Sequence, residues 1–182
     1  MGTIVRRQPT ESERARYVQV RHLLPNGLLA PVEELSEGPT PQGEPDRYRA
    51  AGGDVLLACR GGALRSALVN EASADIFVAN NLIRVRIHEP ATICPEVFLS
   101  WFRSPFVQTP LLAMVTGPIG IHLRAKDVEA FEVPVMPADL QAEIASLYHA
   151  EHRAYVAALE VAEQRRSYAR AAAEQQIFGG TA

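Results

Sequence analysis

Over the first two thirds of the chain, apolar and polar residues alternate in short runs, a pattern typical of half-buried strands. Residues 16–24 alternate in this way and predict a strand, and an Asn-Gly pair at Asn26 predicts a tight turn after it. An apolar run at 55–58 predicts a buried strand between two glycine turns. Further strands are predicted at 65–71 and 79–89.

Between these runs, residues 31–46 favour a short helical turn within a Pro/Gly loop. The spacing of apolar residues becomes helical over 94–115, which predicts two short helices that meet near Pro105. We assign the aromatic residues of this segment to the core, namely Trp101, Phe102 and Phe106, because aromatic residues at helical spacing more often lie in a core than stack on bases.

Residues 116–136 predict a glycine loop, one helical turn and a closing strand at 132–136. Pro134 and Pro137 would end that strand, because proline removes a backbone donor. The expected fold class is α+β, with one domain at 1–137 in which residues 1–15 are loosely ordered, a long helix at 138–178 and a tail at 179–182.

The predicted C-terminal helix begins near Asp139 and has apolar residues at alternating spacings of three and four. At 1.5 Å per residue it is roughly 50 Å long, more than the preceding domain could cover. The sequence therefore predicts pairing with a second helix. The residues expected to form this contact are Leu140, Ile144, Leu147, Tyr155, Ala158, Leu159, Val161 and Tyr168.

Composition narrows the possible partners. The basic residues are 17 arginines and one lysine, Lys126. Arginine suits phosphates and guanine edges, although a GC-rich genome produces the same bias. The net charge of −3 argues against broad non-specific binding of nucleic acid, so any binding must come from a local patch.

No apolar run approaches the ~20 residues of a membrane span, and the first residues lack the apolar core of a signal peptide. We therefore expect a cytoplasmic protein without a membrane partner. Cys59 and Cys94 lie far apart and lack C-x-x-C spacing, which favours buried thiols over a disulfide or a zinc site.

Several segments together resemble the specificity subunit of Type I restriction-modification systems: "GDVLLACRGG", "NNLIRVRI", "PEVFLSWFRSP", "TGPIGIHLRAKDVEAFEVPVMPADLQAEIA" and "QQIFGG". The resemblance implies a target recognition domain followed by a helix that pairs in an antiparallel coiled coil. Members usually carry two such domains and two helices, so this sequence resembles half of a subunit and predicts a homodimer. His22 stands where the family often has an aspartate.

The resemblance also implies a function. It predicts a non-catalytic, sequence-specific DNA-binding subunit that directs a separate adenine methyltransferase to a bipartite target. S-adenosylmethionine would be bound by that methyltransferase, and this chain would need no cofactor. In a full complex, a restriction and translocase subunit would join. The alternative is a coiled-coil adaptor of a defence complex that no longer reads bases.

The strand predicted at 79–89 carries Arg84 and Arg86 on one face and two asparagines at its start. Arginine can pair with guanine and asparagine with adenine in the major groove. A solvated strand face after an asparagine turn would produce the same pattern, and the glycine loops could equally be hairpin turns. The candidate DNA-binding residues are Arg60, Arg65, Asn80, Asn81, Arg84, Arg86, Thr116, Gly117, His122, Arg124 and Lys126.

Catalytic and metal chemistry find little support in the sequence. There is no N/D-P-P-F/Y methyltransferase motif, and Lys126 does not complete a nuclease pattern of the D…E-x-K type. His149 and His152 lie one helical turn apart, but two ligands are too few for a metal site, so we assign them to the surface and expect no metal.

Overall fold

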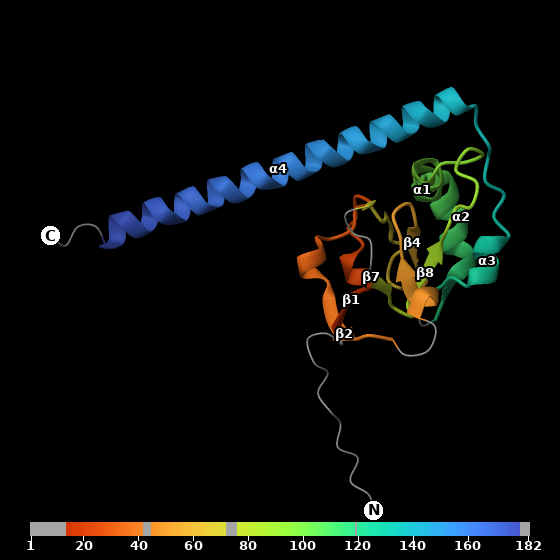
Figure 1. Ribbon diagram of the computed structural model, residues 1–182, viewed down its shortest axis with the longest axis horizontal. Coiled ribbons are helices and arrows are strands. Elements are labelled where there is room, and N and C mark those ends of the chain that lie inside the picture. The colour runs from red at the N-terminus through yellow and green to blue at the C-terminus, as the bar shows by residue number, and fades with distance from the viewer. Residues whose placement is uncertain (1–13, 42–44, 72–75, 119, 179–182) are drawn as a thin grey trace, which may run out of the picture. The chain divides into compact units, whose positions relative to one another are not determined.

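The computed structural model describes residues 14–41, 45–71, 76–118 and 120–178 (Figure 1). The chain divides into two compact units, Met1–Gln141 and Ala142–Ala182. The first unit contains strands, 3₁₀ turns and three short helices, and the second contains most of one long helix. This confirms the predicted α+β class and the long C-terminal helix.

The described strands of the first unit are short. They are β1 (Arg14–Val18), β2 (Ser36–Pro39), β3 (Arg49–Ala50), β4 (Val55–Ala58), β5 (Arg60–Gly61), β6 (Ser66–Leu68), β7 (Ile76–Val78), β8 (Leu82–Val85), β9 (Thr116–Gly117) and β10 (Gly120–His122). Three 3₁₀ turns lie between them: η2 (Val20–His22), η3 (Val32–Glu34) and η4 (Pro45–Tyr48). The helices are α1 (Pro95–Arg103), α2 (Pro105–Val115), α3 (Ala125–Glu129) and α4 (Ala138–Phe178).

These strands form three small sheets. The largest has the order β2-β1-β7-β3, in which β1 and β7 run parallel and the other pairs antiparallel. The second has the antiparallel order β6-β4-β8, and the third has the antiparallel order β5-β10-β9. Strand β5 follows β4 after one residue, so the second and third sheets are directly connected.

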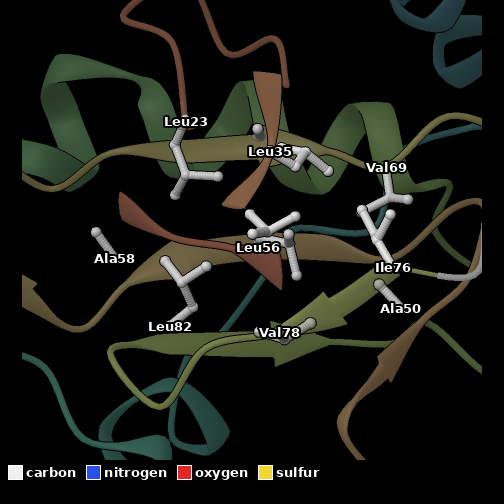
Figure 2. Close-up of a cluster of buried hydrophobic side chains, with 11 residues drawn as sticks. Leu23, Leu35, Ala50, Leu56, Ala58, Val69, Ile76, Val78 and Leu82 are labelled. Atoms are coloured by element: carbon white, nitrogen blue, oxygen red, sulfur yellow. The ribbon is translucent and has the colours of Figure 1, made fainter. Parts of the chain in front are cut away.

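The main hydrophobic core lies between the first two sheets. Figure 2 shows Leu56 at its centre, with Leu82 from β8 and Ile76 from β7 nearby. All four residues of β4 are buried, because the first sheet covers one face of the strand and other apolar residues cover the opposite face. This explains why the sequence shows β4 as a continuous apolar run rather than an alternation.

Helices α1 and α2 meet at Ser104, as predicted, and each begins with a proline at its first position. Helix α1 packs against β6, and Phe102 is fully buried, with its ring 6.2 Å from that of Phe131. Trp101 is half-buried. The core assignment of Phe106 is wrong, because its side chain is 91% exposed on the first turn of α2.

Two strand predictions also need correction. The strand predicted at 16–24 ends at Val18 and continues as η2, in which the Gln19 amide donates to Nδ1 of His22 at 3.0 Å. The strand predicted at 132–136 is wrong: residues 131–137 form no regular element, because Pro134 and Pro137 lack the backbone donors that a ladder requires. Strands β2, β3 and β7 were not predicted, and β5, β9 and β10 lie where the sequence predicted a glycine turn and a glycine loop, because these short strands form only by pairing with one another.

The first turn of α4 belongs to the first unit. Gln141 is 6% exposed, and its Oε1 accepts a hydrogen bond from the Cys94 amide at 2.9 Å. Its Nε2 donates to the carbonyls of Thr92 and Met136, both at 2.9 Å. Gln141 therefore bonds this turn to the segments that precede α1 and α4.

Helix α4 has 41 residues and is about 60 Å long. From Ala142 onward none of its described residues is buried. Leu147, Leu159 and Tyr168 are 63%, 50% and 80% exposed, and Ile144 is half-buried. The residues expected to pair with a second helix are thus available for contact, and their pairing stays a prediction.

Candidate nucleic-acid interface

Three segments that are distant in the sequence meet at Cys59. The amide of Cys59 donates to the Asn81 carbonyl at 3.1 Å, and its carbonyl accepts from the Leu123 amide at 3.0 Å. In the next ladder position Arg60 lies opposite His122. The turn before β8, strand β5 and strand β10 therefore bring the exposed side chains of Arg60, Asn80 and His122 to one edge of the first unit. We refer to this region as the Cys59 edge.

Close backbone packing holds β10 in place at this edge. Gly120 has a φ of +105°, and a Cβ added there would lie 3.1 Å from the carbonyl oxygen of Gly61. A larger residue at position 120 would strain the backbone and crowd β5. On its other side β10 pairs with β9, so that Thr116 lies opposite Ile121 and Gly117 opposite Gly120.

A groove of about 1180 Å³ runs beside this hairpin. Five predicted DNA-contact residues line it, namely Thr116, Gly117, His122, Arg124 and Lys126. The opposite wall comes from α2, where Phe106 is 91% and Met114 80% exposed. The groove thus has an apolar wall and a polar wall, and the lining carries the carboxylates of Asp127 and Glu132 as well as the two cations.

The cations of this region differ in how strongly they are bound within the protein. Arg124 donates to both carboxylate oxygens of Asp127, at 2.8 and 2.7 Å, and these hydrogen bonds lower the pKa of Asp127 to about 2. Within the described part of the chain, neither Arg60 nor Lys126 forms a close ion pair, although the charge of Lys126 contributes to the low pKa of Asp127. Their charges remain available to a ligand, whereas that of Arg124 is already partly neutralised.

Arg84 and Arg86 lie toward the opposite end of β8. Arg86 donates from Nε and Nη2 to the two carboxylate oxygens of Asp54, both at 2.7 Å, and Asp54 is 1% exposed. These hydrogen bonds raise the pKa of Arg86. Arg84 donates to the carbonyl of Arg49, and its Nε lies 4.0 Å from Asp54. The structure therefore separates this pair from the Cys59 edge and gives both side chains internal partners.

The two remaining predicted residues are only partly accessible. Asn81 is half-buried, and its Oδ1 is buried without a hydrogen-bond partner among the described residues. Arg65 is half-buried and donates to the Leu23 carbonyl at 3.3 Å. It lies beside Arg103, a residue that sequence reasoning missed, because one arginine at the end of a helix usually only caps the helix dipole.

Neither metal nor membrane chemistry is evident in the described segments. They contain no group of three or more His, Cys, Asp or Glu residues that could hold a metal ion. Among the described residues, no helix is both long enough and apolar enough to cross a bilayer. Both cysteines are free thiols, and burial raises the pKa of each.

No family model matches the chain, and no curated protein matches it. Among solved structures, its fold is similar to that of the HsdS subunit from Thermoanaerobacter tengcongensis, with a TM-score of 0.59 and 20% sequence identity. The alignment covers 90% of this chain and 40% of that chain, so the protein spans about two fifths of the length of that subunit. HsdS is a Type I restriction specificity subunit, the class that the sequence patterns resemble.

Proposed function

We propose that this protein is a sequence-specific DNA-binding subunit that directs a separate adenine methyltransferase to its target. The observation that carries the proposal is the likeness of fold to HsdS over 90% of the chain. The domain that would read DNA and the helix that would organise the assembly are both part of that alignment. The subunit itself would be non-catalytic.

The Cys59 edge supplies suitable chemistry for reading DNA. The guanidinium of Arg60 can donate two hydrogen bonds to a guanine, and the amide of Asn80 can bond an adenine edge. Lys126 and His122 border the adjoining groove and can hold backbone phosphates. We assign Arg84 and Arg86 a weaker role in DNA contact, because their guanidinium groups already bond within the protein.

The assembly that we propose is a homodimer formed by antiparallel pairing of α4. Helix α4 is about 60 Å long, and its exposed apolar side chains are an aggregation liability unless another helix covers them. A two-fold pair would carry two equivalent recognition domains. Its DNA target would then be an inverted repeat of identical half-sites, separated by a gap that the helix length sets.

The partners follow from this role. Double-stranded DNA is the ligand, and methyltransferase subunits would bind S-adenosylmethionine and carry out methyl transfer. In a full complex, a restriction and translocase subunit would also join. A subunit with this function would act in the cytoplasm, where the chromosome is accessible to it.

A second candidate is a coiled-coil adaptor that has lost base reading. The internal bonding of Arg84 and Arg86, together with the net charge of −3, favours this alternative. The two candidates differ in a measurable way, because an adaptor would retain no particular sequence from a mixture of DNA.

Selection from a random DNA pool by the purified full-length chain tests the proposal. We expect a motif to be enriched, and Arg60→Gln to weaken binding by about 1–3 kcal/mol and relax one position of the motif if Arg60 reads a base. Arg14→Gln is the matched control, because it removes the same charge from an exposed ion pair with Glu37. Recovery of DNA without any enriched motif would favour the adaptor.

A further inference from the structure

A second, smaller pocket lies next to the proposed interface and is lined by basic residues. Its volume is about 320 Å³. Arg65 and Ser66 line it from the segment before and into β6, and Arg103 and Gln108 line it from the junction of α1 and α2. No carboxylate and no aromatic ring is among its described lining residues. The pocket therefore has positive charge, but nothing on which a base could stack.

Both arginines retain unused donors. Nη2 of Arg103 donates to the Pro25 carbonyl at 2.9 Å, and Nη1 of Arg65 donates to the Leu23 carbonyl at 3.3 Å. Neither guanidinium forms an ion pair with a described residue. A guanidinium has five N–H donors, so each keeps several donors and its full charge.

Arg103 lies close against the turn at Gly27. Gly27 has a φ of +86°, which favours glycine, and a Cβ added there would lie 1.5 Å from Nη1 of Arg103. The guanidinium thus occupies the space that a side chain at position 27 would fill. The glycine therefore leaves room for the guanidinium beside the turn, where Nη2 bonds the Pro25 carbonyl.

Ser66 provides an independent indication of a ligand. The residue is 3% exposed, and its hydroxyl is buried without a hydrogen-bond partner among the described residues. Buried polar groups in folded proteins nearly always have a partner, so an unpaired hydroxyl beside two arginines calls for one. Gln108 uses one amide hydrogen on the Phe102 carbonyl, at 3.0 Å, and has a second to offer.

We propose that this pocket binds a single phosphate group. Guanidinium forks, a hydroxyl and an amide N–H are all donors to an oxyanion, and no described lining residue would repel it. The loop at Gly61 and Gly62 connects Arg60 of the Cys59 edge directly to this pocket. The phosphate is therefore one of the DNA backbone, an assignment that rests on the proposed function; a free phosphate ion is the other source of the same chemistry.

The test measures how binding of the selected motif depends on salt. Arg103→Gln should weaken binding of all DNA sequences alike, by about tenfold at low salt, because it removes a charged hydrogen-bond donor. It should also flatten the slope of log K against log salt by about 0.9, the value for one phosphate contact. Arg65→Gln should act in the same direction and provides a second variant if Arg103→Gln does not fold. Arg14→Gln should keep the wild-type affinity and slope.

The other possible results separate failure of the phosphate site from failure of the proposed function. Wild-type affinity and slope in both pocket variants, with motif selection intact, would overturn the phosphate site and leave the proposed function standing. A change confined to one base position of the motif would also overturn it, since a phosphate contact does not distinguish sequences.

If the wild-type chain selects no motif, the proposed function fails, and titration with inorganic phosphate against a chloride control decides the pocket separately. Binding of phosphate that Arg103→Gln abolishes would support a free-anion site. Absence of phosphate binding would overturn the inference.

Discussion

The sequence predicts that Arg86 contacts DNA. Its two hydrogen bonds to the buried Asp54 predict instead that it stabilises the fold. The carboxylate of Asp54 is 1% exposed and accepts two hydrogen bonds from Arg86 and one from the Ala51 amide, at 2.7, 2.7 and 2.8 Å. Arg86→Gln would leave that buried carboxylate with the Ala51 amide and with Arg84, whose Nε is 4.0 Å away. We expect the first unit to become substantially less stable.

The magnitude follows from the burial of the two partners. Removing one member of a fully buried ion pair costs about 3–5 kcal/mol, because the other charge stays buried. Here the Arg86 side chain is 41% exposed, so water can approach the space it leaves, and Arg84 compensates in part. We therefore expect the free energy of unfolding to fall by about 2–3 kcal/mol, somewhat less than for a fully buried pair.

Urea unfolding followed by the fluorescence of Trp101 measures this change. Trp101 is the single tryptophan of the chain and lies in the first unit, with its ring 5.6 Å from that of Phe131. Arg14→Gln, which breaks an exposed pair, should cost less than about 1 kcal/mol. Adding Asp54→Asn to Arg86→Gln should cost less than the sum of the two single changes, by at least about 1 kcal/mol. A loss below about 0.5 kcal/mol for Arg86→Gln would refute the reasoning, since surface changes are that small.

Three further predictions follow from other contacts. Gln141→Leu should lower the stability of the first unit by about 2–4 kcal/mol in the same urea assay, because it leaves the Cys94 amide and two carbonyls unpaired; an unchanged midpoint would contradict this. The contribution of the Arg124–Asp127 pair to stability should be present above pH ~4 and lost as pH falls toward 2, because the folded pKa of Asp127 is about 2 and lies below its unfolded value. Carboxyl NMR titration should find that pKa, and Arg124→Gln should raise it toward the unfolded value, although the backbone amide at position 124 still donates to Asp127. An unchanged pKa in Arg124→Gln would contradict this. Leu147→Glu should halve the mass measured by light scattering, while Ser167→Glu, at a heptad position that carries none of the expected contact residues, should leave it unchanged. A wild-type monomer would contradict the dimer.

Local sequence patterns predicted β4, the two short helices and α4, because the signals for these elements lie within or next to their own residues. The four apolar residues of β4 are buried, as their continuous run indicated, and two short helices meet next to Pro105, as the helical spacing of the apolar residues indicated. Helix α4 was also predicted, because its apolar stripe and the prolines before it are local signals. Strand β2 was missed, since "SEGP" has no apolar alternation and becomes a strand only by pairing with β1.

The candidate site was predicted only in part, because tertiary contacts decide which arginines remain available. On the sequence Arg84 and Arg86 resemble Arg60, yet a buried aspartate more than 30 positions away binds one of them. Phe106 has the spacing of a core residue but lies on the face of α2 that no described element covers. The meeting of β5, β10 and the Asn80 turn at Cys59 depends on long-range backbone bonds that no local pattern reveals.

The central claim is that this chain distinguishes DNA sequences. The most direct measurement compares the affinity of the full-length protein for its selected duplex and for a scrambled duplex of the same composition, at 150 mM salt. A base-reading subunit should bind the selected duplex about 10³-fold more tightly or better, as specific DNA-binding proteins do. A ratio near one would contradict the account, because binding would then depend on the phosphate backbone alone.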